Sequence, residues 1–404
     1  MIIKEDLRNI VIAQRKDVLL ASENIEREKL KEIKVEESFA IILSGVRRCG
    51  KSTLLGQMIK KSKNFYYFNF EDPNAVNFEL SDFETLNKVF NEEYGESNYY
   101  FFDEVQNVEK WELFVRAMLD KGKYFVITGS NASLLSRELG TRLTGRHLNY
   151  ELFPFSFKEF LKFTCKKQDI KSFQEYFIRG GFPQYIKSGR LESLQDLFND
   201  IIIRDIAIRH KIRNLKSLRE MAVYLITNVG KEFSYNSLKK TFGLGSVNSA
   251  ISFVSFFEDS YMLFTVPKFD YSVKKQIINP KKVYSIDNGF SVVNSASFSE
   301  DKGRMLENMA FLNLRKMYKE IFYFQETGEC DFVIKEGTKI TRAIQVCYNL
   351  TEQNKDREIN GLLTAMNKFD LKEGLILTYD QDDEFIIKNK KIKLVPVWKW
   401  LLNK

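Results

Sequence analysis

Cysteine and histidine are scarce in this chain, with 4 Cys and 2 His among 404 residues. The cysteines lie far apart and form no C-x-x-C pair, so the sequence predicts neither a disulfide framework nor a zinc site. Internal repeats and low-complexity tracts are also missing. The sequence therefore indicates an ordinary globular chain, long enough for two or three domains with real cores.

Long apolar runs are missing as well. No stretch approaches the roughly eighteen residues of a membrane-spanning helix, and no signal peptide is recognisable. We therefore expect a cytoplasmic protein without a membrane partner. Aromatic residues, in contrast, are abundant, with 35 Phe and 18 Tyr. The formal net charge of +8 fits contact with nucleic acid, although lysine and arginine are spread along the whole chain.

The most informative motif is G-x-x-x-x-G-K-S at residues 45–52. A strand-like run over 40–44 precedes it and a helix-like pattern over 53–59 follows, which is the context of a phosphate-binding P-loop. Backbone N–H groups of such a loop face phosphate oxygens. Lys51 would contact the β- and γ-phosphates of ATP, and Ser52 would hold Mg²⁺. The predicted nucleotide-binding residues are Gly45, Val46, Arg47, Arg48, Cys49, Gly50, Lys51, Ser52 and Thr53.

A pair of carboxylates follows a second strand-like run, the aromatic residues 98–102. P-loop enzymes hold Mg²⁺ with a carboxylate at the tip of a neighbouring strand, and we assign this Walker B role to Asp103. The adjacent Glu104 could polarise the attacking water as a general base. These two residues, with Lys51, predict ATP hydrolysis rather than ATP binding alone.

Strand-like and helix-like runs alternate from residue 40 to about 152, which predicts a parallel sheet covered by helices. One strand-like run separates the P-loop strand from the Asp103 strand along the chain, as in the P-loop branch with a catalytic glutamate. Ser130 or Asn131, after the next strand, is the candidate sensor of the γ-phosphate. Capping of the following helix explains the same residues equally well.

Three arginines lie downstream, at positions 137, 142 and 146. In ring ATPases an arginine from a neighbouring subunit stabilises the charge of the transition state. We assign this role to Arg146 in preference to Arg142, which implies a homo-oligomer. The alternative is an exposed, solvated arginine.

Six motifs together resemble one known family, and they occur in its order. They are the P-loop at 45–53, F-D-E-V-Q-N at 102–107, T-G-S-N-A-S-L-L at 128–135, L-T-G-R at 143–146, L-F-P-F-S-F-K-E-F at 152–160 and G-G-F-P at 180–183. The series resembles prokaryotic AAA+-like P-loop ATPases with an uncharacterised C-terminal domain of restriction-endonuclease-like type. The resemblance covers essentially the whole chain and implies an ATP-binding core.

We accordingly expect an α/β protein with four parts. Residues 1–152 would form the AAA+-like core, with a helical N-terminal segment packed outside it, and 153–212 a helical lid. Residues 213–290 read as three helices and a β-wing, a winged helix. There Ser246, Asn248 and Ser249 would face DNA, and the wing lysines, at 268, 274, 275, 281 and 282, would contact phosphates without sequence preference. An oligomerisation or interdomain role is the alternative.

Residues 291–404 have the layout of restriction-type nucleases, whose Asp and Glu hold a divalent metal and whose Lys positions water. Glu307 and Asp331 fit that layout. Gln345 and Cys347, however, stand where Glu-x-Lys would, and a neutral amide is a poor Mg²⁺ ligand beside a carboxylate. We therefore predict a degenerate site without nuclease activity.

The predicted function is that of an ATP- and Mg²⁺-dependent switch or motor acting on DNA or on a protein partner. Two alternatives remain: a DNA-processing protein whose ATPase regulates a nuclease-like domain, and an assembly scaffold that binds ATP without hydrolysing it.

Overall fold

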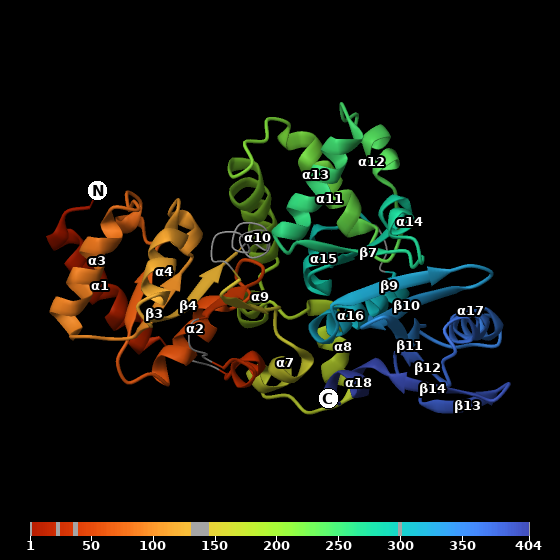
Figure 1. Ribbon diagram of the computed structural model, residues 1–404. Coiled ribbons are helices and arrows are strands. Elements are labelled where there is room, and N and C mark those ends of the chain that lie inside the picture. The colour runs from red at the N-terminus through yellow and green to blue at the C-terminus, as the bar shows by residue number, and fades with distance from the viewer. Residues whose placement is uncertain (1, 22–24, 35–38, 131–144, 298–300, 404) are drawn as a thin grey trace. The chain divides into compact units, whose positions relative to one another are not determined.

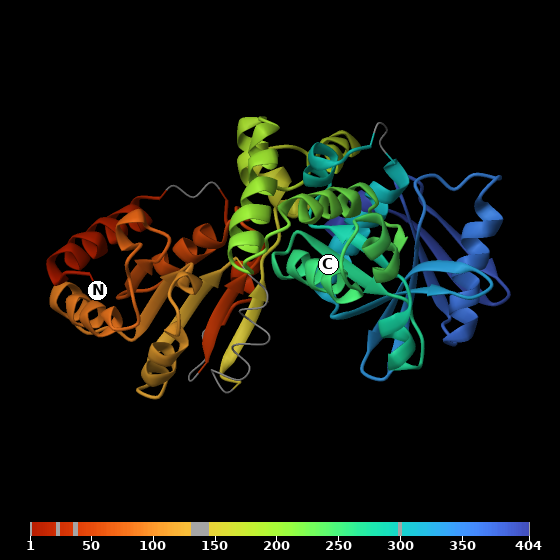
Figure 2. The same cartoon turned by 90° about the horizontal axis from the view of Figure 1, so that it is seen from above.

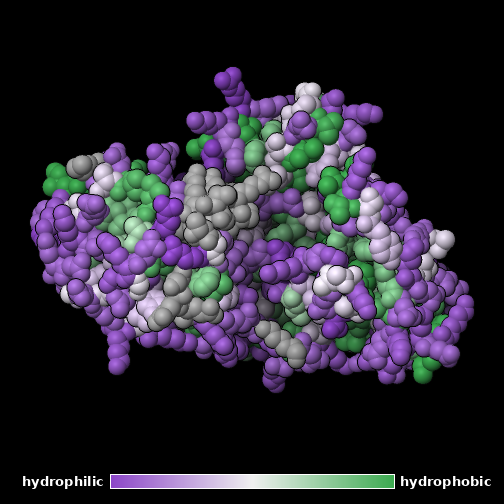
Figure 3. Space-filling view, viewed as in Figure 1, coloured by the Kyte–Doolittle hydropathy of each residue, from purple (hydrophilic) through white to green (hydrophobic). Residues whose placement is uncertain are grey.

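The structure is a computed structural model that describes residues 2–21, 25–34, 39–130, 145–297 and 301–403. The chain divides into two compact units. The first comprises Met1–Phe153 with Asp259–Tyr261, and the second Pro154–Glu258 with Met262–Lys404. Hydrophilic residues cover most of the face shown in Figure 3.

A five-stranded sheet forms the centre of the first unit (Figure 1). All its neighbouring strands are parallel, as the sequence predicts, and their order is β2-β3-β4-β1-β5. β4 lies between the P-loop strand β1 and β3. Because the three strands are parallel, their carboxyl ends meet at one edge of the sheet. The strands are β1 (Ala40–Ser44), β2 (Tyr66–Asn69), β3 (Tyr99–Asp103), β4 (Tyr124–Gly129) and β5 (His147–Glu151).

Helices cover this sheet, and aromatic side chains fill much of the space beneath them. Phe70 packs against Phe83 and Phe102, whose ring centroids lie 5.6 and 5.2 Å away. Burying a phenylalanine contributes about 1.5–3 kcal/mol, so this cluster accounts for part of the high aromatic content. The helical elements are α1 (Lys4–Leu20), η1 (Glu28–Lys31), α2 (Lys51–Lys60), η2 (Pro73–Ala75), α3 (Asp82–Tyr94), η3 (Val105–Asn107) and α4 (Trp111–Leu119).

The N-terminal helix α1 packs beside α3 through an apolar stripe at Leu7, Ile10 and Val11 (Figure 2). Arg8 pairs with Glu92 and Glu93 of α3 at 2.7 and 2.8 Å. The helix therefore lies outside the sheet, as expected for a charged, helix-prone segment.

Helices over 157–208 belong to the second unit. Two of them, over 170–179 and 192–200, contact α15 (Asn288–Asn294), so they pack with the C-terminal half of the chain. Their role as a lid over the nucleotide stays a prediction. The elements are α7 (Phe157–Thr164), α8 (Ile170–Arg179), α9 (Pro183–Ser188), α10 (Glu192–Asp200) and the π-helical η4 (Ile201–Ile208).

The G-G-F-P turn at 180–183 docks on a buried carboxylate. Asp287 accepts the backbone N–H groups of Gly181 at 2.6 Å and Phe290 at 2.9 Å, and burial raises its pKa to about 6. A Cβ atom on Gly180, whose φ is 73°, would lie 2.0 Å from Asp287 Oδ1. The turn needs glycine there because any side chain would displace the carboxylate.

Three helices and a small antiparallel sheet follow, in the element order α11-β6-α12-α13-β7-β8. The sheet order is β6-β8-β7, and a short helix, α14, lies in the hairpin between β7 and β8. Ser234 and Ser237 form a capping box at the start of α12. The elements are α11 (Leu215–Thr227), β6 (Glu232–Phe233), α12 (Tyr235–Thr241), α13 (Val247–Asp259), β7 (Leu263–Pro267), α14 (Val273–Ile278) and β8 (Lys281–Ser285).

A mixed six-stranded sheet, in the order β13-β14-β12-β11-β10-β9, completes the second unit. Gly361 and Gly328 let the helix over 355–368 approach the hairpin that contains Gly328 and Glu329. A Cβ on Gly361 would lie 2.0 Å from Glu329 O. The elements are α16 (Lys302–Met317), β9 (Glu320–Gln325), β10 (Glu329–Glu336), β11 (Lys339–Val346), α17 (Lys355–Lys368), β12 (Glu373–Thr378), β13 (Asp383–Ile387), β14 (Lys390–Pro396) and α18 (Val397–Leu402).

Candidate nucleotide-binding site

The P-loop connects β1 to α2 and turns through three residues with positive φ: Gly45 at 152°, Arg48 at 63° and Gly50 at 102°. A Cβ on Gly45 would lie 2.1 Å from the carbonyl oxygen of Leu152, at the end of β5. The glycine therefore allows the loop to pass directly beside that strand end. Val46 and Cys49 are buried, whereas Arg48, Ser52 and Thr53 are exposed. Arg47 is half-buried and pairs with Glu71 at 2.8 Å.

Lys51 and Glu104 face each other at the edge of the sheet. The Lys51 ammonium donates to the carbonyl oxygens of Gly45 and Val46 at 3.2 and 3.3 Å and lies 3.4 Å from Glu104 Oε1. Burial alone would raise the pKa of the Glu104 carboxyl, but Lys51, Gln106 and Arg47 together outweigh it and the pKa ends below its ordinary value. Glu104 is therefore ionised and able to accept a proton.

Asp103 lies beside Glu104 at the tip of β3. Its carboxylate accepts hydrogen bonds from the hydroxyls of Thr128 and Ser52. Burial, reinforced by Glu104, raises the pKa of Asp103 to about 6. Two hard oxygen donors, Ser52 and Asp103, thus lie within hydrogen-bond reach of each other, which fits a Mg²⁺ ion completed by phosphate and water. When bound, Mg²⁺ would neutralise phosphate charge.

Thr128 is a site residue that the sequence interpretation missed. Besides contacting Asp103, its Oγ1 accepts the backbone N–H of Glu104 at 2.9 Å. Its position at the end of β4, between the two functional strands, was the available signal. Gln106 is a second such residue: it donates to Glu104 Oε2 and reaches Ser130 Oγ at 3.5 Å. Ser130 is thus at the site, while Asn131 lies outside the described residues.

Arg27 hydrogen-bonds to the P-loop and so braces it, although we expected its segment to pack outside the nucleotide core. Its buried guanidinium donates to Cys49 O at 2.7 Å and to Phe153 O at 2.8 Å. Gln57 of α2 accepts the backbone N–H of Arg27 at 3.0 Å. Part of the N-terminal segment therefore belongs to the core. Spacing gave no signal for Arg27, because the contact joins distant parts of the chain.

Arg146 begins the chain segment that enters β5, at the edge of the sheet opposite the P-loop. Its backbone carbonyl accepts the N–H of Ala40, the first residue of β1, and its guanidinium pairs with Asp120 at 2.7 Å. Arg146 therefore cannot serve the nucleotide of its own protomer, and a finger role requires a neighbouring one. Positions 137 and 142 lie outside the described residues.

Three of the four candidate residues of the C-terminal domain, Glu307, Asp331 and Gln345, line a cavity of about 580 Å³. Glu307 of α16 and Asp331 of β10 both contact the ammonium of Lys282, at 3.1 and 2.9 Å. Gln345 of β11 accepts the backbone N–H of Asp331 at 3.2 Å and donates to Glu358 at 2.7 Å. The structure thus brings Glu307, Asp331 and Gln345 together on one cavity.

Cys347 departs from that arrangement, because it packs in the apolar cluster under α17 and does not line the cavity. Burial raises the pKa of its thiol to about 11.

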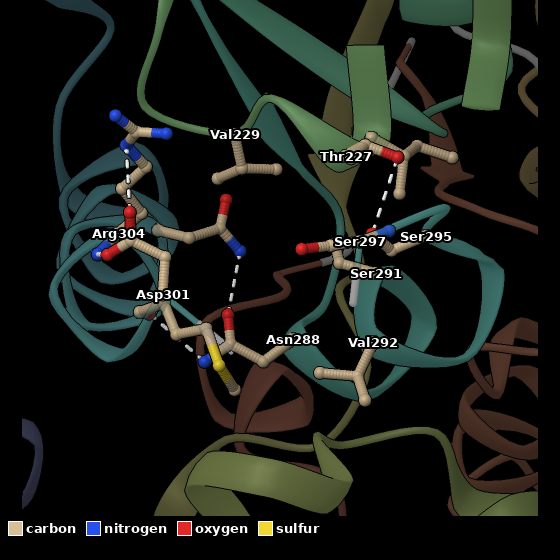
Figure 4. Close-up of a pocket in the computed structure, with 12 residues that line it drawn as sticks. Thr227, Val229, Asn288, Ser291, Val292, Ser295, Ser297, Asp301 and Arg304 are labelled. Atoms are coloured by element: carbon tan, nitrogen blue, oxygen red, sulfur yellow. Dashed lines mark hydrogen bonds and ion pairs between the residues drawn. The ribbon is translucent and has the colours of Figure 1, made fainter. Parts of the chain in front are cut away.

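Another cavity, of about 280 Å³, lies between α11, α15 and α16 (Figure 4). Its polar groups are engaged: Arg304 pairs with Asp301, and Ser295 donates to Thr227.

The five wing lysines do not form one basic surface. Lys268 donates to Gln325 at 3.2 Å, Lys281 is half-buried and donates to Gln276 O, and Lys282 is buried. The expectation that all five contact phosphate is therefore wrong for the buried Lys282. Of the five, Lys274 and Lys275 are exposed, and Lys275 pairs with Asp270 at 3.5 Å. At the start of α13, Ser246 and Asn248 are exposed and Ser249 is half-buried.

Within the described parts of the chain, no group of three His, Cys, Asp or Glu side chains is arranged to hold a metal ion. No helix among them is long and apolar enough to cross a membrane.

Sequence comparison agrees with the P-loop geometry. Residues 37–161 match the family described as AAA domain, and residues 170–299 match a domain of unknown function, DUF8612. An uncharacterized protein of Methanocaldococcus jannaschii, MJ1544, is 35% identical over 100% of this chain and 97% of its own length. The chain belongs to the same family as this archaeal protein, and it carries a AAA domain at residues 37–161. An uncharacterized protein of Haemophilus influenzae is 29% identical over 91% of the chain and 95% of its own length.

Among solved structures, the chain resembles the Aeropyrum pernix ORC1 protein in complex with DNA, at 11% identity and a TM-score of 0.32 over 69% of this chain and 95% of that one. It also resembles domain III of the Thermotoga maritima replication initiation protein DnaA, at 16% identity and a TM-score of 0.25 over 57% and 88%. Scores this low add nothing to the family assignment. The AAA domain at residues 37–161 and the parallel sheet of the first unit support an ATPase-like protein.

Proposed function

We propose that the AAA domain binds ATP with Mg²⁺ and hydrolyses it to ADP and phosphate, and that this cycle drives a switch or motor. The observation that carries the proposal is the convergence of Lys51, Asp103, Glu104 and Thr128 at one edge of the sheet. A domain that only bound ATP would need the lysine but no ionised glutamate beside it.

Each residue then has a defined task. Ser52 and Asp103 would hold the metal ion, and Lys51 would bind the β- and γ-phosphates. Glu104 would take a proton from water as the water oxygen bonds to the γ-phosphorus and the bond to ADP breaks. Because Lys51 and Gln106 now contact Glu104, phosphate must first draw Lys51 away from this carboxylate. Arrival of the substrate would thus free the base.

The test is phosphate release by the purified full chain beside two variants. Lys51→Ala removes the ammonium that meets the phosphates and should abolish ATP binding. Glu104→Gln should bind ATP as tightly as wild type but release phosphate at least 100-fold more slowly, since a positioned base contributes about 10²–10⁴ in rate. Wild-type turnover in Glu104→Gln would refute the assigned base.

We further propose that residues 213–290 form a winged helix that contacts DNA without sequence preference. The helix and strand order supports this, as do the exposed Lys274 and Lys275 on the wing. α13 carries no lysine or arginine, which argues against base-specific contact. Running the phosphate-release assay with and without DNA distinguishes a DNA-responsive motor from one that acts on protein.

We also propose a restriction-endonuclease-like fold for residues 291–404. The succession of α16, the β9-β10-β11 hairpins, α17 and the parallel β12 supports it. Its carboxylates would serve a structural role, because Gln345 is neutral and Cys347 packs in the core.

A further inference from the structure

A single buried ammonium sits at the centre of the C-terminal carboxylate cluster. Lys282 Nζ lies 2.8 Å from Glu329 Oε1, 2.9 Å from Asp331 Oδ1 and 3.1 Å from Glu307 Oε1. Tyr284 donates to the same Glu307 oxygen at 2.6 Å. Only 4% of the Lys282 side chain is exposed, so its charge depends on these carboxylates rather than on water.

The lysine and the carboxylates come from different parts of the second unit. Lys282 lies on β8, in the small antiparallel sheet, whereas the carboxylates lie on α16 and β10 of the C-terminal domain. Its neighbour Lys281 donates instead to the backbone oxygens of Gln276 and Ile277. Of these two adjacent lysines, only Lys282 contacts the carboxylates of the cluster.

The distances are those of ammonium–carboxylate hydrogen bonds. Charge-assisted N–H···O bonds measure about 2.7–2.9 Å, whereas Mg²⁺ draws oxygens to about 2.1 Å and Ca²⁺ to about 2.3–2.6 Å. Three carboxylate oxygens converge on one point, as they do around a divalent cation, but at the spacing of a lysine. Among the described residues, no three His, Cys, Asp or Glu side chains have the spacing of a metal site.

Charge supports the same conclusion. Burial alone would lower the pKa of Lys282, but Asp331 and Glu307 raise it well above its ordinary value. Burial and Asp331 raise the pKa of Glu307 to about 7, so this carboxyl holds a proton for part of the time at neutral pH.

We propose that the Lys282 ammonium takes the place of a divalent cation in this cluster. It ties β8 to the C-terminal sheet and closes the cluster to metal ions. The inference is independent of ATP hydrolysis by the AAA domain.

Manganese binding tests the proposal on the full-length, nucleotide-free protein. Wild type should bind no Mn²⁺ that depends on Asp331, by electron paramagnetic resonance, and its Tm should not respond to Mn²⁺. Lys282→Met leaves three facing carboxylates without a cation, so its Tm should fall by several degrees. One Mn²⁺ should then bind, raise that Tm again, and be lost when Asp331→Asn is added.

Lys281→Met is the matched control and should behave as wild type. If Lys282→Met does not fold, Lys282→Met/Glu307→Gln, with one fewer buried charge, carries the same comparison. Mn²⁺ binding by wild type that Asp331→Asn removes would overturn the proposal. A folded Lys282 variant with no gain in Mn²⁺ affinity over wild type would overturn it equally.

Discussion

The Oγ1 atom of Thr128 accepts the backbone N–H of Glu104 at 2.9 Å. Glu104 has a φ of 51°, in the left-handed region that costs a non-glycine residue roughly 1–2 kcal/mol. The same hydroxyl donates to Asp103. One side chain thus holds the Asp103 carboxylate and the backbone of Glu104.

Thr128→Val, which keeps the shape but removes the hydroxyl, should lower stability by about 1–3 kcal/mol, because a buried N–H and a buried carboxylate lose their partner. Phosphate release should fall at least tenfold, with ATP affinity changed less. Thr128→Ser keeps the hydroxyl and should restore most of the rate. Equal rates in Val and Ser variants would show that the hydroxyl does not position Glu104.

Arg27→Lys should weaken ATP binding although the residue never touches nucleotide. Lysine keeps the charge but cannot span both Cys49 O and Phe153 O as the guanidinium does. Loss of one charge-assisted bond is worth about 1.5–3 kcal/mol, which corresponds to roughly a tenfold to hundredfold rise in Kd if the loop must reorder on binding. Isothermal titration with ATP measures it.

The control for Arg27 is Arg8→Lys, an arginine of the same N-terminal segment whose carboxylate partners lie on α3. That variant should bind ATP as wild type does. An equal loss in both would mean that the segment, rather than the brace, supports the P-loop.

Arg146 should matter only in an assembly, because it lies across the sheet from its own P-loop. If it is a finger supplied to a neighbour, turnover per protomer should rise steeply with protein concentration. Arg146→Ala should bind ATP normally yet hydrolyse it about 10³-fold more slowly. Light scattering that shows a monomer with full activity on dilution would exclude this role.

Acid titration provides a test of the Glu307 environment. The pKa of Glu307 is raised from 4.5 to about 7, so its contribution to stability is complete below pH 4.5 and is lost as pH rises through 7. Lys282, Tyr284, Glu329 and Asp331 face this carboxyl. The unfolding free energy of wild type relative to Glu307→Gln should therefore decrease from pH 5 to pH 8, by at most about 3 kcal/mol.

Denaturant unfolding at several pH values measures that difference. Asp103 and Asp287 also have raised pKa values, but their contributions to the unfolding free energy cancel between the two proteins. A pH-independent difference would show that Glu307 does not titrate in this range.

Charge reversal at Lys274 and Lys275 should weaken DNA binding without altering sequence preference. Removing two phosphate contacts should reduce the slope of log affinity against log salt by about 2. Fluorescence anisotropy at several salt concentrations measures the slope. Lys171→Glu/Lys187→Glu makes the same charge change elsewhere in the second unit and should have a smaller effect. A salt-insensitive wild-type complex would contradict the proposal.

The sequence predicted the AAA domain well because its signals are local. Gly45 to Ser52 and the Asp103–Glu104 pair follow strands whose apolar runs are unmistakable, and the parallel sheet follows from the alternation of strands and helices. Short elements escaped prediction: β6 has two residues, and α14 contains no buried residue, so neither carries an apolar pattern.

Contacts between distant segments also escaped prediction. Lys282 looked like one of five wing lysines, and only the tertiary fold sets it among Glu307, Glu329 and Asp331. A run of lysines has no periodic pattern that separates a solvated ammonium from a buried one. The partners decide the difference, and they lie 25 to 49 residues away along the chain.

The brace from Arg27 has a consequence for where the ATP-binding unit begins. The AAA sequence match starts at residue 37, ten positions after the arginine whose guanidinium supports Cys49. A truncated protein cut at that boundary would retain every recognisable motif and still lose the contact that holds the loop to Phe153, where the chain leaves the first unit. The AAA match thus marks the nucleotide motifs, while the compact unit that contains them extends further toward the N-terminus.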